Sequence, residues 1–307
     1  MSKKISTKLF YRYYGNWIDL YKKGAIRQVT LDKYYLTERK LRELAPELRL
    51  SELNRQTYQK LLNDYAETHE KHTTLDFHHH LKAAIIDALD DGMIKTDPTR
   101  RVIIKGRKPK PKKKKYLNLF ELQMLLKQLK LGTEPNWDWF ILLVAKTGLR
   151  YAEALALTPN DFNYEKQVIT VTKTWNYKYA GGGFRPTKNP TSKRNVMIDW
   201  QLAQQFKQIT QGMDPEKPIF VSGRAFNSTI NIILERLCYQ AEIPVISIHG
   251  LRHTHASLLL YEGVSVASVA KRLGHANITT TQKTYLHIIQ ELENKDNDKV
   301  MHHLSQL

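Results

Sequence analysis

Residues 249–285 read HGLRHTHASLLLYEGVSVASVAKRLGHANITTTQKTY. This stretch concentrates side chains that can contact phosphate, namely the imidazoles of His249, His253 and His275, the guanidinium of Arg252, the hydroxyls at 279–281 and the phenol of Tyr285. Apolar residues between them recur with the spacing of buried helix faces, at 258–260, 264, 266, 269 and 273. The stretch therefore predicts a packed helical scaffold that holds a polar site.

The formal charge of the chain is strongly positive, because 48 Lys and Arg face 30 Asp and Glu and give +18 over 307 residues. Such a charge indicates a polyanionic partner, with nucleic acid as the leading candidate. No apolar run approaches the roughly 20 residues of a membrane-spanning helix, and the N-terminal segment lacks a signal-peptide core. We expect a cytoplasmic protein with no membrane partner and two domains, with its one cysteine, Cys238, in a core.

The first 98 residues carry a helical pattern. Apolar residues spaced three and four apart recur in four successive segments between residues 8 and 91, which predicts a four-helix domain. Three adjacent histidines, His78, His79 and His80, invite a metal hypothesis. Neighbouring residues on a helix point in different directions, however, and no cysteine or acidic cluster joins them. We therefore expect a basic or solvated helix face there.

A basic segment follows at residues 99–115. It contains ten Lys and Arg, no acidic residue, and two prolines, Pro109 and Pro111, that remove backbone donors. It is expected to be a linker, either a free hinge or a tether that lies on phosphates between two DNA-clamping domains, and the tether is favoured because both flanks are folded. The expected DNA-binding residues are Lys108, Lys110, Lys112, Lys113, Lys114 and Lys115.

The second half predicts a mixed domain. A buried helix should end near Thr147 and Gly148, and Arg150 follows it directly. A guanidinium there is costly unless it is paired or points at a ligand, and Glu153 is placed to orient it. The alternating residues from 167 to 198 predict a small antiparallel sheet whose turn carries Lys188, with an ordinary exposed hairpin as the alternative. Helices resume after Trp200, so the fold class is mainly α with a small antiparallel β-sheet.

These residue types suit phosphoryl transfer to a tyrosine. A tyrosine hydroxyl has a pKa near 10, so about one in a thousand is ionised at neutral pH and a neighbour must assist it. Guanidinium and imidazole donors stabilise the charge that develops on phosphate oxygens, and a lysine can protonate the leaving sugar oxygen. The set comprises Arg150 and Arg252 as clamps, His249 and His275 as donors or proton carriers, Lys188 as acid and Tyr285 as nucleophile.

The order of the motifs resembles that of the tyrosine recombinases, also called the phage integrase family. The similar segments are TGLRYAEALALTPNDF, PTKNPTSKR, HGLRHTHAS, and LGHANITTTQKTY with the following LHI. The resemblance covers about residues 116–290, and the helical region resembles the core-site-binding domain of that family. It implies a core-binding domain at 1–98, a linker at 99–115, a mixed α+β catalytic domain at 116–290 and a tail at 291–307 that packs on a neighbouring protomer.

The resemblance implies that Arg150, Lys188, His249, Arg252 and His275 activate the scissile phosphate and that Tyr285 forms a 3′-phosphotyrosyl bond. Glu153 would support Arg150, and Lys173 and Lys178 compete with Lys188 for the lysine role. Strand exchange would need neither ATP nor metal. The implied partners are duplex DNA carrying core sites, a homotetramer, and accessory DNA-bending or directionality proteins, in a protein of phage or bacterial origin. Many integrases begin with an arm-site-binding domain; here the core-binding domain starts almost at Met1, which suggests a truncated or simpler recombinase.

Three alternatives compete with this interpretation. A metal hydrolase would use His249 and His253, four apart on a helix, but HGLRH lacks the glutamate of a zinc-protease helix. A non-catalytic, sequence-specific DNA-binding protein explains the charge and the linker but not the six residues in family order. A type IB topoisomerase would share the chemistry and relax supercoils without joining two sites.

Overall fold

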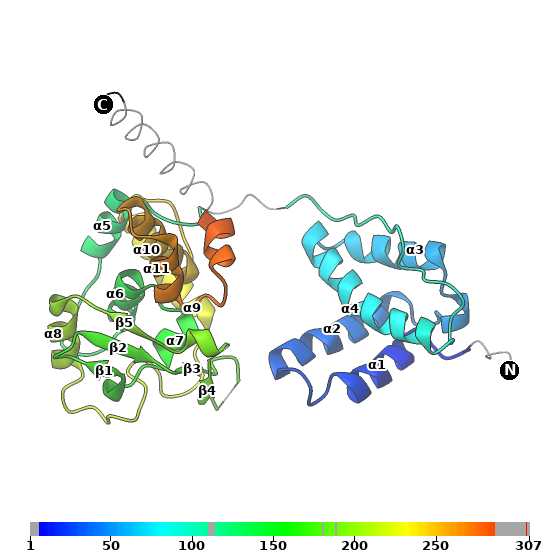
Figure 1. Cartoon of the computed structure of the whole chain (residues 1–307), viewed down its shortest axis with the longest axis horizontal. Coiled ribbons are helices and arrows are strands. Elements are labelled where there is room, and N and C mark those ends of the chain that lie inside the picture. Colours follow the sequence, from blue (N-terminus) through cyan, green and yellow to red (C-terminus); the bar gives the residue numbers. More distant parts are fainter. Residues whose placement is uncertain (1–5, 110–113, 180, 188, 286–304, 306–307) are drawn as a thin grey trace. The chain divides into compact units, whose positions relative to one another are not determined.

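The computed structural model describes residues 6–109, 114–179, 181–187, 189–285 and 305. The chain divides into two compact units, Met1–Pro111 and Lys112–Leu307, which Figure 1 colours from blue to cyan and from green to orange. In the described residues no helix is both long and apolar enough to cross a membrane. The predicted mainly helical fold with small antiparallel sheets is confirmed.

The described part of the first unit contains the four predicted helices. They are α1 (Phe10–Tyr21), α2 (Gln28–Leu44), α3 (Arg55–Ala66) and α4 (Lys71–Asp90), with a short 3₁₀ turn at Leu50–Glu52. Aromatic side chains from different helices fill the core, where Tyr14 stacks on Trp17 and Tyr58 is completely buried. The aromatic content of the first domain therefore serves packing to a large extent.

The histidine row on α4 departs from the expected solvated face. His78 is buried and its Nδ1 lies 3.0 Å from Oη of Tyr58, while half-buried His80 lies 3.0 Å from Oγ1 of Thr37. His79 alone of the three is exposed. The prediction was wrong for His78 and His80 because α2 and α3 pack over their side of α4. No cluster of three potential metal ligands occurs among the described residues.

The first part of the basic segment lies along α3. Ile103 exchanges two hydrogen bonds of 2.8 Å with the Gln59 side chain, and Arg55 donates to the carbonyl of Arg101 at 3.0 Å. The backbone N–H of Arg107 donates to His69 at 2.8 Å. Because these bonds use backbone groups, the high charge does not prevent them. The structure thus assigns the first part of the expected linker to the first unit, which extends to Pro111.

The remaining linker lysines differ in their surroundings. Lys108 and Lys115 are exposed, and Lys114 forms an ion pair with Glu121 at 2.7 Å. Lys110, Lys112 and Lys113 lie outside the described residues.

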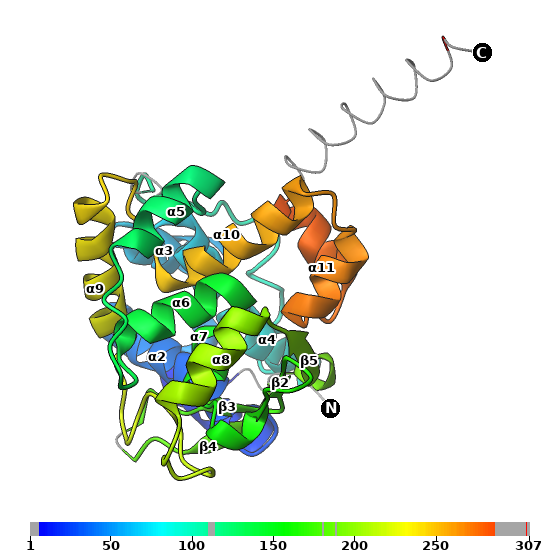
Figure 2. The same ribbon diagram turned by 90° about the vertical axis from the view of Figure 1, so that its left-hand side faces the viewer.

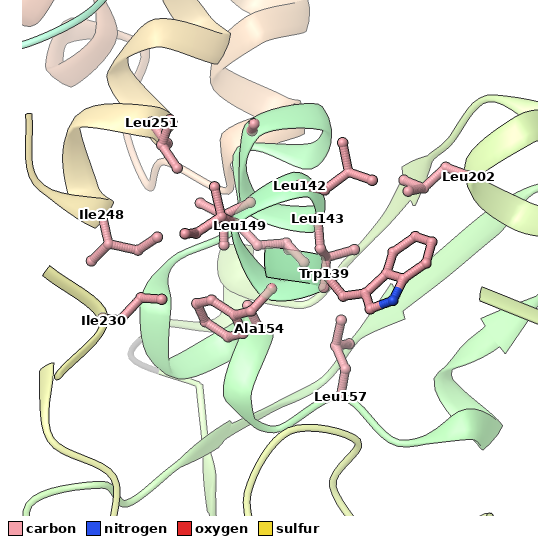
Figure 3. Close-up of a cluster of buried hydrophobic side chains, with 14 of the residues drawn as sticks. Trp139, Leu142, Leu143, Leu149, Ala154, Leu157, Leu202, Ile230, Ile248 and Leu251 are labelled. Atoms are coloured by element: carbon pink, nitrogen blue, oxygen red, sulfur yellow. The ribbon is translucent and has the colours of Figure 1, made fainter. Parts of the chain in front are cut away.

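The second unit is built around α6 (Trp137–Thr147). This helix ends as predicted at Gly148, which adopts a left-handed conformation with φ 66°. Figure 3 shows the apolar cluster around it, and Figure 2 shows α10 (Ile248–Tyr261) above it. Cys238 is fully buried, as expected. The other described helices are α5 (Leu119–Lys127), α7 (Tyr151–Leu155), α8 (Trp200–Ile209), α9 (Asn227–Gln240) and α11 (Val266–Leu273).

The strands in the described part of the chain form two small antiparallel sheets. One has the order β1-β2-β5, with strands Phe162–Asn163, Val168–Val171 and Arg194–Met197, and its register pairs Ile169 with Val196. The other pairs β3 (Lys173–Trp175) with β4 (Phe184–Pro186). The one small sheet expected from residues 167–198 is therefore divided into two sheets. Strand β5 contacts α11, and this contact positions the site.

Candidate active site

Helix α10 carries three of the site residues on adjacent positions of one face. Ser247 caps the helix by accepting from the N–H of Gly250 at 3.1 Å. Residues three and four apart lie side by side on a helix, so His249 stands next to Arg252 and His253. The rings of His249 and His253 meet edge to face at 4.8 Å. The contact of α10 with buried α6 fixes these side chains relative to Gly148 and Arg150.

The C-terminal end of α11 is surrounded by three arginines. Helix ends leave carbonyl groups without partners inside the helix and carry partial negative charge, so cations bind there favourably. Here three successive carbonyls each accept from a different guanidinium. Nε of Arg194 donates to Arg272 at 2.6 Å, Nη2 of Arg252 donates to Leu273 at 2.7 Å, and Nη2 of Arg150 donates to Gly274 at 2.9 Å.

Glu153 connects two of these arginines. Its carboxylate, only 1% exposed, accepts from Nη1 of Arg150 at 2.7 Å and from Nη2 of Arg194 at 2.9 Å. Burial alone would raise the pKa of Glu153, but the charges of Arg194 and Arg150 outweigh burial and lower it. The predicted pairing of Glu153 with Arg150 is present, and Arg194 is a further member of the cluster that the sequence did not reveal.

Arg252 is the most deeply placed cation of the cluster. It is 3% exposed, and Nη1 donates to the carbonyl of Gly148 at 2.6 Å. Burial and the nearby charge of Arg150 lower the pKa of Arg252, which still leaves it cationic at neutral pH. A buried guanidinium held by two carbonyls keeps unused N–H donors in a fixed orientation.

Tyr285 lies inside the second unit. It is 2% exposed and belongs to the helical residues 278–285, where its ring packs with Leu260, Val269 and Leu273. Its Oη lies 2.9 Å from Nδ1 of His253. Burial raises the pKa of Tyr285 to about 12, although Arg252 opposes the shift. Only about one phenol in 10⁵ is then ionised at neutral pH.

His275 follows directly on the arginine-bound helix end. Its Nδ1 lies 2.7 Å from Oγ1 of Thr281. Burial, followed by the charges of Arg252, Arg150 and Arg194, lowers the pKa of His275 to about 4. The pKa of His249, whose side chain is exposed, is also lowered, by partial desolvation and by Arg252 and Arg150. Both imidazoles are therefore neutral hydrogen-bonding groups at pH 7.

The structure brings five of the six predicted residues into one cluster, namely Arg150, His249, Arg252, His275 and Tyr285. Lys188 lies outside the described residues. Lys173, its first competitor, forms an ion pair with Asp161 at 2.6 Å, and Lys178 is exposed.

Two residues that the sequence reasoning did not assign to the site contact it directly. His253 was left out of the expected catalytic set, but its Nδ1 contacts Oη of Tyr285. Its position four residues after His249 was the signal that could have identified it. Arg194 pairs with Glu153. His255, in contrast, is buried, and its Nδ1 lies 3.0 Å from the carbonyl oxygen of Ala145.

An open groove of about 1030 Å³ adjoins the cluster between β5 and α11. His275 and Arg194 border it, together with the cations Lys193, Lys271 and Arg272. Apolar residues such as Val264 and Ile278 form most of the groove surface, and the cations at its border give it a positive charge that favours a polyanion.

Arg150, His249, Arg252, His275 and Tyr285 follow one another along the chain and meet in one helical domain. This arrangement of arginines, imidazoles and a buried tyrosine is the one expected of a tyrosine recombinase. Residues 115–291 match the phage integrase family, and the chain belongs to that family. Among its relatives are the integrase of Staphylococcus phage L54a, 28% identical over 51% of this chain and 49% of that protein, and a XerC-like tyrosine recombinase of Caldanaerobacter subterraneus, 26% identical over 68% and 60%. The match thus spans about half the length of the first of these relatives.

Solved structures share the fold. An integrase of the transposon Tn1549 in complex with transposon right-end DNA superposes with a TM-score of 0.74, at 19% identity over 91% of this chain and 95% of that one. A lambda integrase dimer bound to a core site gives a TM-score of 0.67, at 17% identity over 91% and 77%. These similarities extend over both units of the chain.

Proposed function

We propose that this protein is a site-specific DNA recombinase, an integrase of a mobile element, that cleaves and rejoins DNA strands through a 3′-phosphotyrosyl intermediate. The observation that carries the proposal is the burial of Tyr285 next to Arg252, which is fixed with Arg150 on one helix end. A phenol enclosed beside two oriented guanidinium groups is suited to attack on a phosphodiester. Family membership supports the same reaction.

Each side chain has a role in this mechanism. Arg150 and Arg252 donate to the non-bridging oxygens of the scissile phosphate, and Glu153 orients Arg150. Neutral His249 and His275 add donors without adding charge. Oη of Tyr285 forms a bond to phosphorus while the bond from phosphorus to the 5′ oxygen breaks. Lys188 protonates that departing oxygen, a role for which Lys173 is less suited because Asp161 binds it.

Rejoining reverses these steps with a different strand. The phosphotyrosyl bond retains the energy of the broken phosphodiester, so a free 5′ hydroxyl attacks it without ATP. The reaction as proposed uses no metal ion, because the guanidinium groups stabilise the charge on the phosphate.

The substrate would be duplex DNA carrying core sites, bound by both units. The four-helix unit would act as the core-site-binding domain, residues 99–115 as the tether and 116–290 as the catalytic domain. The groove beside α11 and the exposed Lys108 and Lys115 supply positive charge for this purpose. The DNA-bound integrase structures of the same fold support it.

The assembly would be a homotetramer on two sites, with residues 291–307 packing on a neighbouring protomer, and accessory DNA-bending or directionality proteins would assist it. The names of the relatives support a phage or bacterial origin. A DNA substrate places the protein in the compartment that contains the chromosome.

A nicked suicide duplex tests the proposal. Such a duplex loses a short fragment on cleavage, so a covalent adduct with this protein should accumulate, resist denaturant and form in the presence of a chelator. Tyr285→Phe should abolish the adduct and keep DNA binding, because the substitution removes only the hydroxyl. An undiminished adduct in that variant would overturn the assignment of the nucleophile.

Two alternatives give different outcomes. A wild-type protein that binds DNA and forms no adduct would be the non-catalytic DNA-binding protein. An adduct-forming protein that relaxes supercoiled DNA and never joins two sites would be the type IB topoisomerase-like enzyme.

A further inference from the structure

We propose that His253 is a further catalytic residue, which accepts the phenolic proton of Tyr285 as the tyrosine attacks the phosphate. This inference rests on the recombinase function proposed above and concerns one proton in it. The carrying observation is the hydrogen bond of 2.9 Å between Nδ1 of His253 and Oη of Tyr285. A general base must lie within hydrogen-bond distance of the proton that it removes, and His253 meets that requirement.

The surrounding elements fix this contact on both sides. His253 sits one residue after buried Arg252 on α10, and its ring meets that of Tyr285 at 5.8 Å between centroids. On its other side the ring of His249 approaches to 4.8 Å. Tyr285 is held by apolar packing against α10 and α11. The phenol and the imidazole are thus preorganised, which reduces the cost of reaching the reactive geometry.

The other imidazoles are engaged differently. His275 directs Nδ1 at Thr281, at 2.7 Å. His249 packs edge to face against the ring of His253 rather than against the phenol. Those two residues remain suited to contact phosphate oxygens, whereas His253 contacts the atom that must lose a proton.

His253 is neutral in the free protein. Among the described residues five groups face it: His249 and Arg252 on α10, Lys115 before α5, His275 after α11, and Tyr285. Burial and then the two α10 neighbours and Lys115 lower the pKa of His253 to about 4. A neutral imidazole protonated on Nε2 presents the lone pair of Nδ1 to the phenol, which is the state that a base requires.

The low pKa of His253 and the high pKa of Tyr285 keep the pair unreactive without DNA. A bound phosphate places negative charge beside Arg252 and Arg150, which offsets the cationic field and raises the pKa of His253. The phenol also becomes more acidic as its oxygen bonds to phosphorus. The proton therefore moves during attack rather than before it.

The bond between Oη of Tyr285 and phosphorus forms, the bond between phosphorus and the 5′ oxygen breaks, and the phenolic proton passes to Nδ1 of His253. The departing 5′ oxygen takes a proton from the general acid. On rejoining, the incoming 5′ hydroxyl attacks, the phosphotyrosyl bond breaks, and His253 returns its proton to Tyr285.

Single-turnover cleavage of the suicide duplex tests this role. His253→Gln keeps a hydrogen-bonding side chain that cannot take up the proton, so cleavage should slow by about 10²- to 10⁴-fold with DNA affinity retained. On a duplex with sulfur in place of the leaving 5′ oxygen, His253→Gln should be slowed relative to the wild type by the same factor. A thiolate leaves without protonation, whereas the phenol must still lose its proton. Glu165→Gln, at an exposed side chain in the turn between β1 and β2 of the second unit, is the control and should cleave normally.

Chemical rescue covers the case in which glutamine disturbs the fold. His253→Ala cleavage should increase with added imidazole, and a packing role would give no such rescue. Three results would each overturn the inference: a wild-type rate of cleavage by His253→Gln, a wild-type rate of this variant on the sulfur duplex, or no increase in His253→Ala cleavage with imidazole. Failure of the wild-type protein to form any adduct would instead overturn the proposed function.

Discussion

Replacing Glu153 by glutamine should uncouple the arginine cluster. The two side chains have nearly the same shape, but glutamine removes the negative charge that lies between Arg150 and Arg194. Arg194 is 5% exposed and cannot recover hydration. Removal of one partner from a buried ion pair costs about 3–5 kcal/mol, so the second unit should lose stability of that order.

Cleavage should fall for a separate reason. Arg150 loses the carboxylate that orients it, so the phosphate meets a misplaced donor. A loss of one well-placed donor to a developing oxyanion corresponds to about 10²- to 10³-fold in rate. Urea unfolding and single-turnover cleavage of the suicide duplex measure the two effects.

Asp214→Asn provides the control within the same unit. It removes a negative charge from an exposed pair with Lys217, where solvent screens the interaction, so the stability of the unit should hardly change. If Glu153→Gln destabilised the unit no more than this control and cleaved DNA normally, the carboxylate would not organise the site and the reasoning would be refuted.

Three further predictions concern the helix end, the buried histidine and the linker. Gly274→Ala should lose most cleavage activity, because Gly274 has φ 66° and an added Cβ would lie 2.9 Å from Nη1 of Arg194; an active variant would show that the helix end tolerates displacement. Acid should destabilise the second unit. Nε2 of His255 accepts from Arg272, and burial lowers the pKa of His255 to about 3, below its unfolded value near 6.5. The stability that neutral His255 contributes is complete above pH 6.5 and is lost as the pH falls toward 3. The loss from this group should reach about 2 kcal/mol at pH 5, and His255→Gln should flatten the pH dependence of urea unfolding; an unchanged dependence would contradict it. Neutralising the lysines at 112–115 should reduce the logarithmic salt slope of duplex binding by about 3–4, and an unchanged slope would identify a free hinge.

Helix periodicity predicted much of the fold because it depends on local spacing. The four helices of the first unit and the end of α6 at Gly148 followed from that spacing. Burial of His78 and His80 did not, because it depends on α2 and α3 covering one side of α4. The first part of the basic segment was expected to remain a linker, yet the backbone carbonyl and N–H of Ile103 bond to Gln59 of α3, and the N–H of Arg107 donates to the carbonyl of His69. Side-chain charge gives no information about such bonds.

The sequence predicted the site residues that belong to the recognised motifs. It did not predict those that reach the site only through tertiary contacts. The order of Arg150, Arg252 and Tyr285 was sufficient to predict their proximity. Arg194 joins Glu153 from 41 residues away, and His253 meets Tyr285 from 32 residues away. The spacing of four residues places His253 beside His249 on one helix face, but no local pattern specifies that it contacts Tyr285 or that Arg194 pairs with Glu153.

The three arginines at the end of α11 have a mechanical consequence. Moving the helix end by even one bond length would break the hydrogen bonds to Arg150, Arg194 and Arg252 together. The three bonds therefore form or break as one unit. Two of these guanidinium groups, those of Arg150 and Arg252, are proposed to hold phosphate, and the segment that carries the tyrosine begins just after the helix end. Coupling between two equilibria is reciprocal. If a bound phosphate shifts the position of the end of α11, then movement of the tyrosine segment must change the affinity for phosphate. The position of Tyr285 and the affinity for DNA should therefore change together, because both depend on the same equilibrium of the end of α11.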